Sequence, residues 1–439
     1  MLTLTVDGTP AFEAQLRRLR GRGASDLEAV APAVRAILDD VRAEGDDAVL
    51  RYVERFERRT PAVLVTRTFD GAGALARLPA PVRDALTFAA ARIERFHERE
   101  REPGFRFEDA DGVTLGLRVR PLARVGVYAP GGKARYPSSV LMAAIPARVA
   151  GVRDLVLATP APDDAILAAA HLSGVTEILD AGGAQAIGAL AYGTASVTAV
   201  DKIVGPGNAY VACAKRMVFG EVDIDSIAGP SEILVLADES ADPRLVAADL
   251  LSQAEHDEDA WAILATTSRA LADATVAAIA EQLVTQPRRA IIEASLRDRG
   301  VALVVTSVDR LVKIGNAIAA EHVALHVADP EALLDRIHAA GAILVGPLAP
   351  VAAGDYLAGP SHVLPTGGGA RFGAPLGVYD FVTRSSIIGY SAAALARHAP
   401  HITALARAEG LEAHARAVEL RLGAVGARTR GVNEPQSGP

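Results

Sequence analysis

Short apolar runs alternate with helical segments of about 10 to 15 residues from roughly residue 124 to residue 347. The runs read, in order, "RVGVYAP", "DLVLAT", "EILDA", "VDKIVGPG", "SEILVLAD", "WAILAT", "VALVVT", "HVALHVAD" and "AILVGP". This alternation is typical of βαβ units and a parallel sheet. The runs are more numerous than one open sheet holds comfortably. We therefore predict an α/β protein with two doubly wound domains.

Charge and composition narrow the possible partners. The chain has 439 residues with 45 basic and 53 acidic side chains, a net charge of −8. Nucleic acid binding requires clustered Lys and Arg, so we expect no nucleic acid partner. The single cysteine, Cys213, excludes an internal disulfide and fits a reducing compartment. We find neither a signal peptide nor an apolar run of the roughly 20 residues that span a bilayer, and expect a cytoplasmic protein without membrane contact.

A helix predicted to begin at Asp242 and Pro243 ends in "LLSQAEHD" and carries Gln253 and His256 three residues apart. That spacing allows an amide oxygen and an imidazole nitrogen to bind one ion. The partial negative charge of a helix C-terminus favours a cation there. For this pair alone, a solvated helix end explains the pattern at least as well.

Other polar residues lie in segments with two possible interpretations. Glu321 and His322 in "IAAEHVALHV" directly precede a predicted strand, so they form either an acid–base pair or a surface Glu beside a packed His. Asp355 and His362 lie in "GDYLAGPSHVLPTGGG", within a Gly- and Pro-rich stretch longer than an ordinary connector. There Asp355 is either a turn residue or a ligand. In "RAEGLEAHARAVELR", a solvated amphipathic helix explains the charged side chains without a site.

Two glycine turns join a predicted strand to a predicted helix, "YAPGGK" and "GPGNAYV". Such turns bind nucleotides in α/β folds. Neither has the G-x-G-x-x-G spacing, so spacing alone does not establish a dinucleotide site.

In combination and in this order, a series of segments resembles the histidinol dehydrogenase family over nearly the whole chain. A series in order is far more specific than any single motif. The segments are "VGVYAPGGKARYPSSVLMAAIPARVAGV", "GGAQAIGALAYGT", "VDKIVGPGNAYV", "IAGPSEILV", "LLSQAEHD", "AEHVALHV", "GDYLAGPSHVLPTGG" and "EGLEAHARAV".

The resemblance implies a reaction and a set of site residues, with no departure from the family pattern at any of them. L-histidinol would be oxidised to L-histidine, the last steps of histidine biosynthesis, with two NAD+ reduced at one site. The implied acid–base residues are Glu321 and His322. The implied zinc ligands are Gln253, His256, Asp355 and His414. Two nitrogens and two oxygens suit Zn²⁺, one ion per subunit, although Mn²⁺ or Co²⁺ fit such a set.

Further positions follow from the same resemblance. The implied substrate contacts are Ser231, Gln253, His256, His322, Asp355, His362, Glu409 and His414. The implied nucleotide contacts are Tyr128, Gln185 and Asn208. The alternatives are a zinc-dependent dehydrogenase acting on another small polar alcohol, a zinc hydrolase, and a non-catalytic binding protein. The complete set of implied substrate residues disfavours the first alternative, and the Glu321–His322 pair disfavours the last.

The resemblance also implies a domain-swapped homodimer with shared active sites. We expect two incomplete Rossmann-like domains with small N-terminal and helical C-terminal extensions. The expected boundaries are residues 1–22 for the N-terminal extension, 23–127 with 233–380 for the metal and substrate domain, 128–232 for the domain with the NAD contacts, 386–430 for a helical dimerisation segment, and 431–439 for a disordered tail.

Overall fold

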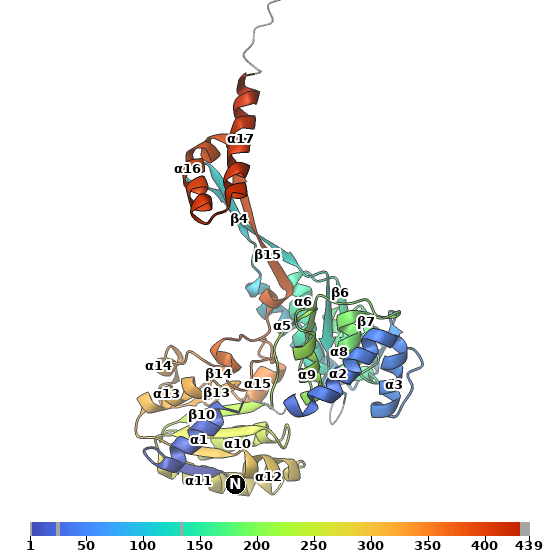
Figure 1. The fold of residues 1–439 in the computed structure, drawn as a ribbon. Coiled ribbons are helices and arrows are strands. Elements are labelled where there is room, and N and C mark those ends of the chain that lie inside the picture. Colours follow the sequence, from blue (N-terminus) through green and yellow to red (C-terminus); the bar gives the residue numbers. More distant parts are fainter. Residues whose placement is uncertain (1, 23–26, 132–134, 431–439) are drawn as a thin grey trace, which may run out of the picture. The chain divides into compact units, whose positions relative to one another are not determined.

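The structure is a computed structural model that describes residues 2–22, 27–131 and 135–430. It divides into two compact units, the first made of Met1–Arg101 with Pro121–Phe381 and the second of Glu102–Arg120 with Val382–Pro439 (Figure 1). The tail at 431–439 that was predicted to be disordered lies outside the described residues. None of the helices in the described ranges is long and apolar enough to cross a membrane.

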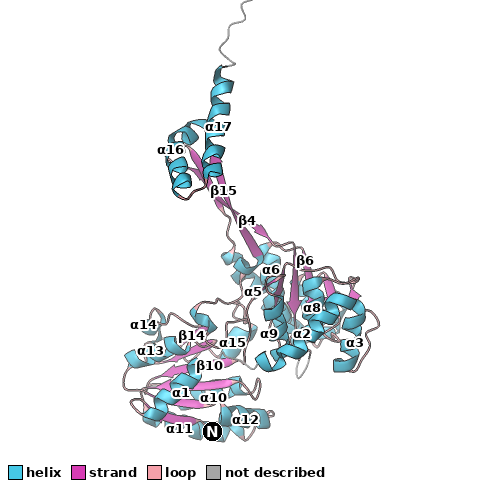
Figure 2. Cartoon of the chain, in the orientation of Figure 1, coloured by secondary structure: helices cyan, strands magenta, loops and turns pink. Residues whose placement is uncertain are grey.

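The first sheet of the first unit has six parallel strands in the order β1-β12-β11-β10-β13-β14. Its middle strand β10 is apolar on both sides, with Ile233 and Val235 in one core and Leu234 and Leu236 in the other. Helices therefore cover both faces (Figure 2). The strands are β1 (Thr3–Val6), β10 (Glu232–Ala237), β11 (Trp261–Thr266), β12 (Val301–Val304), β13 (His322–His326) and β14 (Ala342–Val345).

The helices of this sheet divide between the two cores. One core takes side chains from α10 (Pro243–Ala254), α11 (Arg269–Leu283), α12 (Arg289–Asp298) and α15 (Val351–Tyr356). The other takes them from α1 (Pro10–Arg20), α13 (Val308–Ile318) and α14 (Pro330–Leu334).

The second sheet of the first unit has the order β2-β7-β6-β5-β8-β9, parallel except for the pair β2–β7. It too has a core on each face. The strands are β2 (Val65–Thr66), β5 (Arg124–Tyr128), β6 (Asp154–Ala158), β7 (Glu177–Leu179), β8 (Lys202–Val204) and β9 (Asp223–Ile224). One face is covered by α2 (Leu27–Glu44), α3 (Asp46–Glu57), α8 (Gly183–Tyr192) and α9 (Ala209–Val218). The other is covered by α5 (Ala80–His97), α6 (Pro137–Ala150) and α7 (Asp164–Ser173), and α4 (Gly71–Arg77) packs on α7.

The observed packing places segments at both ends of the first unit differently from the predicted domain boundaries. Residues 1–22 are not an extension, because β1 pairs with β12 at the edge of the first sheet. The helices of residues 27–97 pack on the second sheet rather than with residues 233–380, since the apolar faces of α2 and α3 are buried against α8 and α9. Near the other end, Val363, Leu376 and Phe381 also join the core of the second sheet.

The second unit contains a three-stranded sheet of order β15-β4-β3 and a pair of packed helices, α16 and α17. The segment 386–430 was predicted to be helical, but its first residues belong to a strand, and the helix begins at Ala392 after the N-cap Ser391. The elements are β3 (Phe105–Glu108), β4 (Val113–Pro121), β15 (Val382–Tyr390), α16 (Ala392–Ala408) and α17 (Glu412–Arg430). The 3₁₀ turns of the chain, all in the first unit, are Glu98–Glu100, Gly369–Arg371 and Val378–Phe381.

Candidate active site

Glu321 and His322 lie at the amino end of β13, between β10 and β14 in the first sheet. Helix α13 ends at Ile318, and Ala319 turns the chain with a positive φ of 49° before the strand begins. Both residues are only 6% exposed. A buried Glu and His at a strand end agree with an acid–base pair rather than with the surface Glu of the alternative interpretation.

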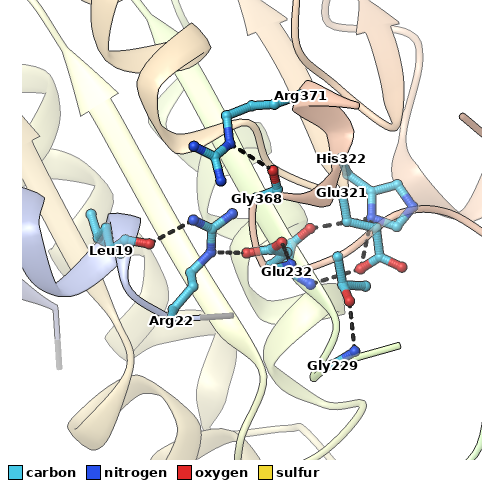
Figure 3. A network of polar contacts seen from close by, with 10 residues as sticks. Leu19, Arg22, Gly229, Glu232, Glu321, His322, Gly368 and Arg371 are labelled. Atoms are coloured by element: carbon cyan, nitrogen blue, oxygen red, sulfur yellow. Dashed lines mark hydrogen bonds and ion pairs between the residues drawn. The ribbon is translucent and has the colours of Figure 1, made fainter. Parts of the chain in front are cut away.

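The peptide of Glu232, at the amino end of β10, contacts both side chains (Figure 3). Its N–H donates to Oε2 of Glu321 at 2.8 Å, and its carbonyl oxygen lies 3.3 Å from Nδ1 of His322. A carbonyl can only accept, so Nδ1 carries the proton. The free nitrogen of a neutral ring is then Nε2, which lies 3.6 Å from Oδ1 of Asp355.

Burial and neighbouring charges together shift the pKa values of Glu321, His322 and Asp355. Burial raises the pKa of Glu321 to about 7. Burial alone would lower the pKa of His322, but the carboxylates of Glu321 and Asp355 outweigh it and raise that pKa to about 9. For Asp355, burial is outweighed by its contact with His322, and its pKa is lowered. Glu321 can therefore exchange a proton near neutral pH, as acid–base catalysis requires.

Helix α10 begins where the sequence predicted but carries only Gln253 of the predicted ligand pair. It begins after Asp242, whose side chain accepts from the N–H of Arg244, and it ends at Ala254. Gln253 is 0% exposed, and among the described residues neither its Oε1 nor its Nε2 has a hydrogen-bond partner. His256 follows the helix and is exposed. Because buried amides are nearly always hydrogen-bonded, the unpartnered Gln253 points to a ligand at this helix end.

Asp355 lies in the short helix α15 rather than in a loop, and His362 follows in the Gly- and Pro-rich stretch. Nδ1 of His362 donates to the backbone carbonyl of Asp355 at 2.8 Å, and Nε2 lies 3.0 Å from Oγ of Ser139 on α6. Burial lowers the pKa of His362, which favours its neutral form. The two hydrogen bonds fix the ring, and Ser139 is a site residue that the sequence analysis missed.

A cavity of the first unit is lined by three predicted residues together, Ser231, Glu321 and His362. Its other polar lining residues, which the sequence analysis missed, are Asp225, Ser226 and Thr366. Asp225 is held in place because its Oδ2 accepts from the N–H of Gly205 at 2.8 Å and its Oδ1 pairs with the buried Lys215.

The predicted metal ligands are only partly brought together within the first unit. Across the described residues, no group of three or more His, Cys, Asp or Glu side chains is placed to hold a metal ion. The first unit contains two predicted ligands of these residue types, His256 and Asp355. The third predicted ligand in this unit, Gln253, would bind through an amide. The unpartnered Gln253 amide still fits a cation, because its oxygen with an imidazole and a carboxylate makes the mixed N/O set that zinc accepts.

Glu409 and His414 lie in the second unit. Glu409 caps the end of α16, and His414 is in the first turn of α17. Both are exposed.

Tyr128 is the last residue of β5, and Gln185 and Asn208 follow the carboxyl ends of β7 and β8 in the second sheet. The hydroxyl of Tyr128 accepts from the N–H of Gly183 at 3.1 Å, and Asn208 caps α9 by accepting from the N–H of Val211 at 3.2 Å. Gln185 is buried and Asn208 is exposed.

The turn "GPGNAYV" joins β8 to α9 as predicted. Gly205, its first residue, has a φ of +114°, and a Cβ there would lie 2.1 Å from the carbonyl oxygen of Tyr128, so only glycine fits. The last two residues of the other glycine turn, "YAPGGK", lie outside the described residues, which resume at residue 135.

Comparison with known proteins establishes the family. The family model described as histidinol dehydrogenase matches residues 20–422. The chain belongs to the histidinol dehydrogenase family. A histidinol dehydrogenase from Dechloromonas aromatica is 51% identical over 425 residues, which cover 95% of this chain and 98% of that protein. One from Gluconobacter oxydans is 52% identical over 410 residues, or 92% and 95% of the two chains.

A solved structure supports the same family. The crystal structure of histidinol dehydrogenase from Elizabethkingia anophelis has a TM-score of 0.91 and 34% identity, and the match covers 97% of this chain and 99% of that one. The resemblance predicted from the ordered segments is thus confirmed, as is an α/β fold with parallel sheets. The site residues and the domain-swapped dimer stay predictions.

Proposed function

We propose that the protein catalyses the NAD-dependent four-electron oxidation of L-histidinol, through L-histidinal, to L-histidine, the last steps of histidine biosynthesis. The observation that carries the proposal is the buried Glu321–His322 pair, which the peptide of Glu232 orients in a member of this family. Glu321 opens into the cavity that Ser231 and His362 also line. Ser231, His362 and Glu409 would contact the substrate.

A metal would be held by Gln253, His256 and Asp355, with His414 as the fourth ligand. Bound zinc would supply a Lewis acid that binds the imidazole and amino nitrogens of the substrate. The unpartnered amide of Gln253 and the carboxylate of Asp355, whose pKa is lowered by His322, support this assignment. Gln253, His256, Asp355 and His414 would therefore contact the substrate through the metal ion that they bind.

The proton steps follow from the orientation of the pair. With Nδ1 bound to the carbonyl of Glu232, Nε2 is the atom of the neutral His322 ring that would accept the hydroxyl proton of histidinol as hydride leaves to NAD+. Because the pKa of His322 is raised to about 9, the ring must lose one proton before this step. Glu321 then activates water for addition to the aldehyde. After releasing the first proton to solvent, His322 would accept a proton from the hydrate hydroxyl as a second NAD+ takes the second hydride. Keeping the aldehyde in the site preserves its geometry and avoids its loss to solvent.

NAD+ would bind at the carboxyl edge of the second sheet, near Tyr128, Gln185 and Asn208. In both sheets the chain order reverses between two neighbouring strands, β5 and β8 in one and β10 and β13 in the other. Such reversal points are where doubly wound folds bind nucleotides. This strand order supports two incomplete Rossmann-like domains.

The active site would be completed by a second copy of the chain. Glu409 and His414 are exposed in the second unit, as residues that serve a neighbouring subunit must be. We therefore propose a domain-swapped homodimer in which each site takes Asp355 from one chain and His414 from the other.

The test is absorbance of NADH with purified protein, zinc, NAD+ and histidinol. Formation of NADH from histidinol is the expected result. NADH from another small polar alcohol but none from histidinol would favour the related dehydrogenase instead. Turnover of an ester or amide without NAD+ would favour a zinc hydrolase.

A further inference from the structure

The backbone of residue 232 is the one element that contacts both members of the Glu321–His322 pair in the hydrogen bonds described above. A shift of this peptide would change the position of the Glu321 carboxylate and the tautomer of His322 at the same time. Partners that orient a reacting imidazole in this way are as important for its function as its direct contacts.

The side chain of Glu232 is unusual for a strand, because a carboxyl group is buried at the start of an otherwise apolar run. Its side chain is 1% exposed, and its Oε2 pairs with Nε of Arg22, which is also 1% exposed. Arg22 donates through Nη1 to the carbonyl of Leu19 at the end of α1. The ion pair therefore ties β10 to the N-terminal segment.

The other oxygen of Glu232 reaches the glycine-rich stretch. Its Oε1 accepts from the N–H of Gly367 at 2.6 Å. The same turn is held by Arg371, which donates to the carbonyl of Gly368 at 3.0 Å, and by Thr366, whose hydroxyl accepts from the N–H of Gly229 at 2.6 Å (Figure 3). Glu232 is thus fixed from two directions, and Thr366 in this turn lines the cavity.

We propose that the Arg22–Glu232 ion pair is a positioning element for the proposed reaction, which holds the peptide of residue 232 so that it orients Glu321 and His322. Neither Arg22 nor Glu232 needs to touch the substrate. The expected loss of kcat rests on the proposed function. The expected displacement of the residue 232 peptide does not.

A buried ion pair contributes little net stability compared with apolar side chains, while removing one partner leaves an uncompensated charge. The informative variant is therefore the double substitution Arg22→Met with Glu232→Gln, which removes both charges and keeps an amide oxygen for Gly367. The matched control is Arg310→Met with Asp7→Asn. Arg310, on α13, contacts both carboxylate oxygens of Asp7 at 3.0 Å and ties the segment after β1 to that helix. Its side-chain hydrogen-bond partners among the described residues are Asp7 and Glu13, not Glu321 or His322.

We expect the Arg22–Glu232 double variant to lose about 10- to 100-fold in kcat for histidinol, as substitutions behind reacting groups commonly do. The KM values for histidinol and NAD+ should change little, because the cavity and the nucleotide edge are intact. The control double variant should keep its kcat. Arg22→Lys, which preserves the charge, should retain more activity than Arg22→Met, and this comparison still decides if the double variant does not fold.

A kcat within about twofold of the starting protein in the folded double variant, or an equal loss in the control, would overturn the proposal. If the unmodified protein produces no NADH from histidinol, the proposed function fails instead. The geometric claim is then still tested by crystal structures of the double variant and of Arg22→Lys. The N–H of residue 232 should move away from Oε2 of Glu321, and an unchanged contact near 2.8 Å in both would refute positioning.

Discussion

Replacing Gln253 with Met should stabilise the metal-free protein while abolishing its response to zinc. Gln253 is fully buried, and among the described residues both of its amide atoms lack a partner. An unsatisfied buried polar group costs about 1–3 kcal/mol. Met has nearly the same length and no polar amide, so Gln253→Met should raise the free energy of unfolding by about that amount.

Zinc should reverse the order of stability, so that the unmodified protein has a higher free energy of unfolding than Gln253→Met. A ligand that binds only the folded state stabilises it by about 2.7 kcal/mol when present at about 100 times its Kd. The unmodified protein should gain this increment, and Gln253→Met should gain little, because one of its four donors is missing. The assay is urea unfolding of both proteins after treatment with a chelator and again with added zinc.

The matched control is Gln15→Met on α1. Gln15 is also buried, and its Nε2 has no partner among the described residues, but it lies outside the proposed site. This variant should keep the full zinc increment. The reasoning about Gln253 is wrong if Gln253→Met is less stable than the unmodified protein without metal, or if zinc stabilises both equally.

Three further outcomes follow from the same site. His256→Ala should fold normally but lose bound zinc and activity, as measured by metal analysis and NADH absorbance, and full activity without metal would end the ligand assignment. Glu321→Gln should slow the oxidation of supplied histidinal more than that of histidinol, and an unchanged rate from the aldehyde would contradict water activation by Glu321. Asp355→Ala and His414→Ala should each be inactive, but after subunit exchange half the dimers are mixed and each has one intact site, so roughly a quarter of the activity should return. No recovery, with exchange confirmed by size analysis of tagged chains, would show that His414 serves its own chain.

The parallel sheets were predictable because their strands are buried on both faces and appear in the sequence as continuous apolar runs, such as "ILVLA" in β10. The sheet on which a segment near the N-terminus packs was not predictable. The apolar face of α2 indicates a buried helix, but nothing in its periodicity says which sheet buries it. Strand β15 was missed because most of its residues are exposed, which leaves no apolar signal.

Some residues of the candidate site could be predicted from the sequence and others could not. Glu321, His322 and His362 were found from local segments and the family resemblance, and the structure brings them together. Ser139 and Asp225 were missed because they are ordinary polar residues whose role depends on contacts with distant segments. Glu232 did leave a signal, since a charged residue at the first position of a buried apolar strand needs a buried partner. That partner, Arg22, is 210 residues away in the sequence, beyond any local pattern.

The most direct test of the central claim is the number of NADH molecules formed per histidinol. A limiting amount of histidinol is consumed by the zinc-loaded protein with excess NAD+, and NADH and histidine are measured at completion. Two NADH and one histidine per histidinol are expected, without free aldehyde in solution, because the Glu321–His322 pair serves both oxidations at one site. One NADH per histidinol with accumulating histidinal would contradict the account.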